Sequence, residues 1–311
     1  MQNQVRSMLE GALISGIFLV IMFLTLYTPI GIITSIALPI PFTVYAARNP
    51  LKRSILVVIA STLLTIFIGA LPSMLSALFA GLLGTVMGTL YYRQKPAFIV
   101  FVGGTIASLV FLLGSMLASY FFLNINPVTA IQTMTKESFE MSRSMLEQFG
   151  GADPEKLEAL ERMVGMLGKM VPMLLIFGSS QFSILNHWLS RKILLRLGNP
   201  VPGFPPFREW RWPRSLLYLY LAVVTLSFFI GANPEQMSYV LLLNIKPILD
   251  LMLIIQGLSI ISYFSYQKGW GKGLLVFAVV LVFIFPPFPF ILMLLGIMDL
   301  GINFRNQPKQ K

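Results

Sequence analysis

Residues 191–214 read RKILLRLGNPVPGFPPFREWRWPR and form the longest interruption in the apolar second half of the sequence. Six basic residues stand there against one acid. Four prolines and two glycines between Gly198 and Pro206 exclude a continuous helix, because proline lacks an amide proton and clashes with the preceding turn. Tryptophan and arginine then lead into the apolar run from Leu216, which is typical of a membrane–water interface. We therefore expect residues 191–214 to be a cytoplasmic loop.

The composition of the whole chain indicates a membrane protein. The sequence has 311 residues, of which 56% are hydrophobic and 11% charged, and its mean hydropathy is +0.79. A water-soluble protein of this length could not cover so much apolar surface with polar groups. Apolar runs of about 18 or more residues recur, and each can cross a bilayer as a helix. The sequence predicts an all-α, polytopic transmembrane helical bundle.

The apolar segments number about ten, or eight or nine if the proline-rich ones do not cross the membrane. Pro39 and Pro41 interrupt the second segment, which is either a short span or a re-entrant piece. Three prolines between 286 and 289 split the last stretch into one broken span or two short ones. The predicted segments are 8–27, 32–47, 54–71, 73–92, 97–123, 172–189, 216–230, 237–266 and two within 273–302.

Residues 124–170 differ from the rest of the chain in composition. Seven of the twelve acidic residues lie between Glu137 and Glu161, and methionine and leucine recur at helical spacing. Asp153 and Pro154 suit the start of a second helix. We expect two extracytoplasmic amphipathic helices, which form either a solvated hairpin or a functional lid. The insertion separates an N-terminal membrane block, 1–123, from a C-terminal block, 171–311.

The distribution of basic residues predicts the orientation. Most of the 23 Lys and Arg residues cluster after alternate apolar segments, in the 191–214 loop and in the C-terminal tail. Cytoplasmic loops of membrane proteins carry such an excess. We therefore expect a multi-pass protein of the cell membrane with both termini in the cytoplasm. The net charge of +11 fits this explanation, and no nucleic-acid-binding pattern accompanies it.

Asp250 is the most informative residue for a binding site, because it lies near the middle of the apolar run 237–266. A charge there costs several kcal/mol (~3 or more) unless it faces a cavity or a partner. Lys246 stands four residues earlier and can pair with it on one helix face. The pair either neutralises itself for insertion or forms a polar ligand site with Asn244. Gln181, in the middle of segment 172–189, could line the same cavity.

Enzymatic chemistry has little support in the sequence. The chain has no cysteine and one histidine, His187, which we expect to be an interfacial side chain. Neither a phosphate-binding G-x-x-x-x-G-K-[ST] loop nor an HExxH or GxSxG motif occurs. We therefore predict that the protein is no enzyme and has no catalytic residues, metal site or cofactor.

Two stretches resemble known membrane protein families. The pattern GALISG at 11–16, followed by PIP at 39–41 and RNPLKR at 48–53, resembles the N-terminus of the substrate-binding (S) components of energy-coupling-factor vitamin transporters. This resemblance implies that Ala12 and Gly16 contact a transmembrane coupling subunit. The FREWRWP signature at 207–213, together with the overall layout, resembles the YybS-like family of bacterial multi-pass proteins.

Two functions remain open from the sequence. The first is a substrate-binding or permease-type component for uptake of a small solute. Such a component would need a partner ATPase and a coupling subunit, and it would dock through Ala12, Gly16 and the aromatic loop with Trp210 and Trp212. The second is a scaffold for cell-envelope or division assembly, as in the MreD-like group. Both functions place the protein in contact with membrane lipid.

Overall fold

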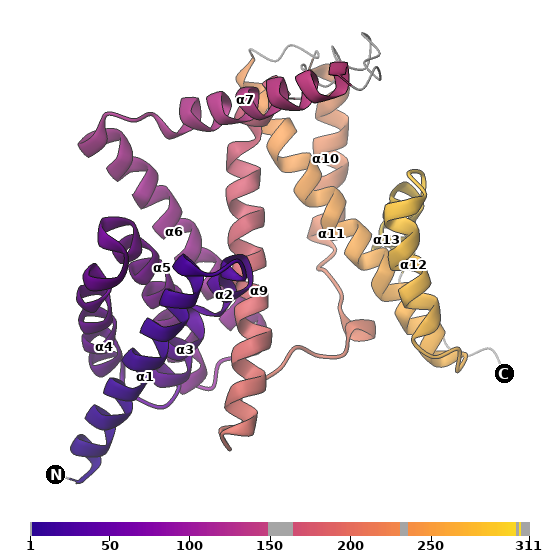
Figure 1. Ribbon diagram of the computed structural model, residues 1–311. Coiled ribbons are helices and arrows are strands. Elements are labelled where there is room, and N and C mark those ends of the chain that lie inside the picture. The colour runs from indigo at the N-terminus through magenta and orange to yellow at the C-terminus, as the bar shows by residue number, and fades with distance from the viewer. Residues whose placement is uncertain (1, 149–163, 231–235, 303–304, 306–311) are drawn as a thin grey trace. The chain divides into compact units, whose positions relative to one another are not determined.

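The computed structural model describes residues 2–148, 164–230, 236–302 and 305, and those residues form helices joined by loops, with no strand (Figure 1). The all-α prediction is therefore confirmed. Six helices in these ranges are long and apolar enough to cross a membrane, and four further apolar helices of 10–17 residues accompany them. Their positions match the ten predicted segments, because continuous apolar runs form helices wherever backbone polar groups must be satisfied without water.

The chain divides into two compact units. Unit 1 comprises residues 1–130 and 174–204, and unit 2 comprises residues 131–173 and 205–311. This grouping differs from the three predicted blocks, because it joins most of the helix after the insertion to the N-terminal helices. Unit 1 contains α1 (Gln2–Tyr27), α2 (Gly31–Ala37), α3 (Pro39–Ala46), α4 (Leu51–Leu64), α5 (Ile66–Tyr92), α6 (Ala97–Leu123) and most of α9 (Val171–Arg196).

Helix α3 forms the centre of unit 1, and all eight of its residues are buried. Gly84 and Gly88 of α5 allow the close approach, because a Cβ at either position would collide with the backbone of α3. Contacts along α1 show the direction of the α2–α3 segment: Thr25 bonds Thr34 at one end, and Ser7 bonds Tyr45 at the other. The segment therefore runs antiparallel to α1 rather than turning back part-way.

Pro72 marks a sharp bend at the start of α5. Helical backbone continues through this proline, but the Ser73 hydroxyl donates to the carbonyl oxygen of Thr65 at 2.8 Å. Residues eight apart in a straight helix would be separated by about 12 Å along the axis. The predicted break near residue 72 is thus a kink through which the chain reverses between the α4 span and the rest of α5.

Unit 2 is organised around the long helix α11 (Met237–Gln267), against which α10 (Ser215–Phe229), α12 (Gly273–Ile284) and α13 (Phe288–Ile302) pack (Figure 1). Gly257 of α11 and Gly296 of α13 bring two backbones together. A buried apolar cluster from α10, α11 and α13 fills the adjoining space. The unit also holds most of α7 (Pro127–Gln148) and the short 3-10 helices η1 (Gly168–Met170) and η2 (Phe207–Glu209).

Helix α7 accounts for the first half of the predicted amphipathic insertion 124–170, and its methionines 134, 141 and 145 are exposed. The second predicted helix, with its start at Asp153 and Pro154, lies mostly outside the described residues. The extracytoplasmic side of the insertion stays a prediction.

Basic and aromatic side chains pair at particular helix ends. Lys192 lies 3.7 Å from the Trp188 ring in unit 1, and Arg208 lies 3.8 Å from the Tyr266 ring in unit 2. Such cation–π pairs are favoured where an apolar span meets water. In unit 2, Arg305 also donates to the backbone of Arg208, so Arg305 lies at the same end of the unit as the aromatic loop, residues 207–212. The cytoplasmic assignment of that end stays a prediction.

Candidate functional site

The predicted ion pair of α11 is present. Nζ of Lys246 lies 2.8 Å from Oδ2 of Asp250, and the two side chains are 42% and 22% exposed. The second oxygen, Oδ1, is buried and has no hydrogen-bond partner in the described part of the chain. The hydroxyl of Tyr220 on α10 lies within hydrogen-bonding reach of the same carboxylate, although it makes no close contact with Oδ1. The pair therefore keeps an unfilled acceptor, which is the feature that a ligand donor, or a water molecule, would complete.

Asn244 stands close to this pair along α11, but its amide is committed to the backbone. Its Oδ1 accepts from the amide of Met173 at 2.9 Å, and its Nδ2 donates to the carbonyl oxygens of Lys169 and Val240, each at 2.8 Å. The bonds to Met173 and Lys169 join α11 to the junction of η1 and α9, and the bond to Val240 lies within α11. Asn244 thus ties two segments of unit 2 together, and its predicted ligand role has no direct support from these contacts.

Gln181 lies on α9 in unit 1, with an exposed side chain, whereas Lys246 and Asp250 belong to unit 2. Its placement in the same cavity as Asp250 stays a prediction.

The two small residues predicted to contact a partner lie on an open face of α1. Ala12 and Gly16 are exposed, and a Cβ at Gly16 would meet no atom within 4 Å. The adjacent face is packed inside unit 1, where Ser15 accepts a 2.9 Å hydrogen bond from Ser61 of α4. The GALISG stretch therefore has one face used within the unit and one face left uncovered by it.

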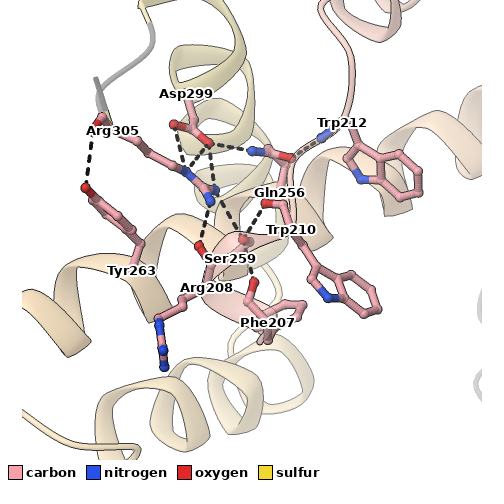
Figure 2. Close-up of polar contacts among 9 residues, drawn as sticks. All are labelled: Phe207, Arg208, Trp210, Trp212, Gln256, Ser259, Tyr263, Asp299 and Arg305. Atoms are coloured by element: carbon pink, nitrogen blue, oxygen red, sulfur yellow. Dashed lines mark hydrogen bonds and ion pairs between the residues drawn. The ribbon is translucent and has the colours of Figure 1, made fainter. Parts of the chain in front are cut away.

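The aromatic loop is attached to α11 through its backbone (Figure 2). The Ser259 hydroxyl contacts the carbonyl oxygens of Phe207 and Trp210 at 2.8 and 2.7 Å, and Oε1 of Gln256 accepts from the amide of Trp212 at 3.0 Å. The indole of Trp210 donates to the carbonyl oxygen of Pro205 within the loop. The two predicted partner-binding tryptophans are thus held in place by the protein's own helix.

A buried ion pair between Asp299 and Arg305 also fixes the aromatic loop. Asp299 of α13 is fully buried, and Nη2 of Arg305 approaches it to 2.9 Å. Arg305 also donates to the carbonyl oxygen of Arg208 at 2.7 Å and to the Ser259 hydroxyl at 3.1 Å. Gln256 completes the network by donating to Asp299 (Figure 2). Every charge in the network is compensated, which is what a buried ion pair requires to be tolerated.

Sequence reasoning did not identify Asp299, Gln256, Ser259 or Arg305 as members of a polar network. One signal was available, since Gln256, Ser259 and Tyr263 recur at i, i+3 and i+7 in an otherwise apolar run. That spacing indicates a polar stripe on one face of α11. Their common target could not be read from the sequence, because Gln256 is 43 residues from Asp299 and Ser259 is 52 residues from Phe207 of the loop.

The chemistry available in these clusters is polar binding and positioning. Among the described residues, no group of three or more His, Cys, Asp or Glu side chains could hold a metal ion. The network of Figure 2 has its polar groups engaged with each other, whereas Asp250 retains a free acceptor. We therefore take the Lys246–Asp250 pair as the candidate ligand site. The Asp299–Arg305 network lies in the same unit, and we take its role to be structural.

Comparisons with known proteins cover nearly the whole chain. A family model described as "Predicted membrane protein (DUF2232)" matches residues 16–300. The sequence is 30% identical over 310 residues to "Uncharacterized protein YybS" of Bacillus subtilis (strain 168), and the alignment covers 99% of this chain and 100% of that relative. No solved structure matches the chain. The matched region of the family model includes Gly16, Asp250 and Asp299.

Proposed function

Because this multi-pass membrane protein belongs to the DUF2232 family, to which the YybS-like resemblance pointed, we propose that it is a substrate-binding or permease-type component for uptake of a small solute. Its partners would be a membrane coupling subunit and an ATPase, since the sequence has no phosphate-binding glycine loop of its own. The observation that carries the proposal is the uncovered small-residue face of α1.

That face has the form of a helix-docking surface. Ala12 and Gly16 are four residues apart, so they lie one turn above the other on the same side of α1. Small residues at this spacing let a second helix approach closely, and van der Waals packing then drives association in lipid. The large neighbours Leu9 and Leu13 are also exposed and would flank a docked helix. The docked helix that we propose is that of a coupling subunit, which is what the resemblance of this stretch to S components implies.

The proposed solute site is the Lys246–Asp250 pair. Oδ1 of Asp250 can accept a hydrogen bond from a solute, and Lys246 can donate one. A small solute with both donor and acceptor groups matches this combination. Pro247 lies between the two residues, and its ring frees a backbone carbonyl one turn earlier in α11 from its usual partner.

The experiment is an affinity capture from the native membrane in mild detergent, read by mass spectrometry for proteins and small molecules. Gly16→Leu should lose a captured ATPase and coupling subunit. Gly114→Leu on α6 is the matched control, since Gly114 is also exposed in unit 1 and a Cβ there meets nothing within 4 Å. Equal recovery from both variants, or no ATPase with the wild type, would contradict the proposal.

A scaffold in cell-envelope or division assembly is the second candidate, and α7 favours it. Met134, Met141 and Met145 are all more than half exposed along this helix. Exposed methionines adapt to varied apolar partners. Capture of cell-wall or division proteins by the wild type, lost when all three methionines are changed to serine, would select the scaffold. Capture that depends on Gly16 instead would exclude it as the main role.

A further inference from the structure

A second polar cluster lies in unit 1, and the solute site does not use it. His187, on α9, is 2% exposed, contrary to the interfacial position expected for it. Nδ1 of its ring lies 2.7 Å from the hydroxyl of Tyr91 on α5, and the ring of Phe204 packs against it at 4.6 Å. The loop after α9 folds back far enough to cover the histidine, which explains why its place in the sequence did not reveal its burial.

Arg191 follows His187 by one helical turn and lies on the same side of α9. A Cβ at Gly203 would collide with its guanidinium, so the guanidinium packs directly against the returning loop. It is also close enough to Tyr91 and His187 to act on both electrostatically. His187, Arg191 and the Gly203–Phe204 turn thus form one cluster, held together by residues of unit 1 alone.

Three nitrogen atoms in this region are buried and have no hydrogen-bond partner among the residues that the structure describes. They are Nε2 of His187, Nε of Arg191 and Nδ2 of Asn186. The Asn186 oxygen accepts from Thr43 at 3.0 Å and Ser190 at 3.2 Å, so its free end is the amide nitrogen. We assign the Tyr91 proton to the short contact with Nδ1, which leaves the proton of the neutral ring on Nε2. All three nitrogens are therefore donors.

Buried donors without partners are costly, and proteins normally satisfy them. A buried water molecule needs acceptors for its own hydrogens as well as donors, and these three nitrogens supply none. The unprotonated oxygens of an oxyanion only accept hydrogen bonds, and a guanidinium paired with one of them forms a short charge-assisted hydrogen bond. The Arg191 side chain also brings the positive charge that the anion requires.

We propose that His187 and Arg191 form a binding site for a phosphate-type oxyanion at the basic end of unit 1, with Asn186 as a third donor on the adjoining face of α9. The oxyanion is either free phosphate or the phosphate of a lipid headgroup. This site is independent of the proposed solute uptake. His187 is the only histidine in the chain, so its ring reports on the site without interference.

The test uses protein labelled with ¹⁵N-histidine and washed free of lipid in maltoside micelles, which contain no phosphate. Inorganic phosphate is titrated in one arm and phosphatidylglycerol in the other, with sodium chloride matching the ionic strength. A saturable shift of the Nε2 resonance is expected in at least one arm. A response to inorganic phosphate identifies a soluble ligand, and a response to lipid alone identifies a headgroup.

Two variants of Arg191 and one control define the site. Arg191→Gln should weaken binding by roughly tenfold or more, as expected for loss of a charge-assisted hydrogen bond. Arg191→Lys keeps the charge and removes Nε, so it should weaken binding less. This variant provides the test if Arg191→Gln does not fold. Arg196→Gln removes an exposed charge from the same helix and should leave the titration unchanged. No saturable shift in either arm, or the same shift in all variants, would overturn the proposal.

Discussion

Gly257 of α11 and Gly296 of α13 lie against each other's helices, Gly257 at the carbonyl of Leu292 and Gly296 at the carbonyl of Leu253. This reciprocal contact leaves no space for a side chain at either position. It also brings Gln256 and Asp299 together, because each lies within one turn of one of the two glycines. The polar network of Figure 2 therefore depends on this close crossing of α11 and α13.

Gly296→Ala should destabilise unit 2, because the added methyl group would overlap the Leu253 carbonyl and force α13 away from α11. Overpacking of this kind costs about 1–3 kcal/mol. Gly301→Ala is the matched control on the same helix, since its Cβ would make only an ordinary 3.8 Å contact with Leu217. Thermal unfolding in detergent measures the difference. Equal midpoints for the two variants would show that the helices are not in backbone contact.

Asp299→Asn should be more damaging than its conservative shape suggests. It leaves the Arg305 charge, 9% exposed, without its counter-ion, and breaking a buried pair in this way costs about 3–5 kcal/mol. The exposed pair of Glu10 and Arg48 provides the comparison, and Glu10→Gln should cost about 0–1 kcal/mol. Denaturant titration followed by tryptophan fluorescence checks both. Similar costs for the two substitutions would contradict the burial of Asp299.

Lys246→Met should lower the yield of folded protein more than Asp250→Asn does. The methionine leaves the Asp250 carboxyl group in an apolar helix without its counter-ion, whereas the asparagine leaves a lysine that can extend toward water. The double variant should recover most of the loss. Membrane yield and monodispersity after solubilisation provide the measurement. If Asp250→Asn is the worse of the two, the aspartate is held by something other than Lys246.

The same two single variants also test the solute site. If small-molecule capture is unchanged in both, with normal yield, this pair is not part of the binding site. Loss of the captured molecule in Asp250→Asn, with yield retained, would support the proposed role.

Tyr91→Phe should change the tautomer of His187. With the Tyr91 proton assigned to its short contact with Nδ1, the wild-type ¹⁵N spectrum should show an unprotonated Nδ1 and a protonated Nε2. Removal of the hydroxyl leaves Nδ1 buried without a donor, and the ring should move toward a mixture of tautomers. Tyr92→Phe changes the exposed neighbour on α5 and should leave the histidine spectrum as it is. A wild-type ring protonated at Nδ1 would reverse the donor assignment.

Hydrophobic runs predicted the ten apolar segments, because a helix that crosses lipid needs a fixed length of apolar sequence. Local spacing also predicted the Lys246–Asp250 pair, since residues four apart meet on every helix. The burial of His187 escaped prediction because it depends on Phe204, which returns from a proline-rich loop whose path no periodicity reveals. The Asp299 network escaped it for a related reason, because its partners come from three separate segments.

The buried contacts of Arg305 also have a mechanical consequence. This side chain is bonded to Asp299 on α13 and to the backbone of the aromatic loop, while the loop is bonded to α11. These bonds couple the loop to α11, to α13 and to Arg305. A change in the tilt of α13 within the lipid would therefore shift the loop residues Glu209 and Arg211, whose side chains are exposed. A protein bound to these side chains would then respond to the tilt of α13.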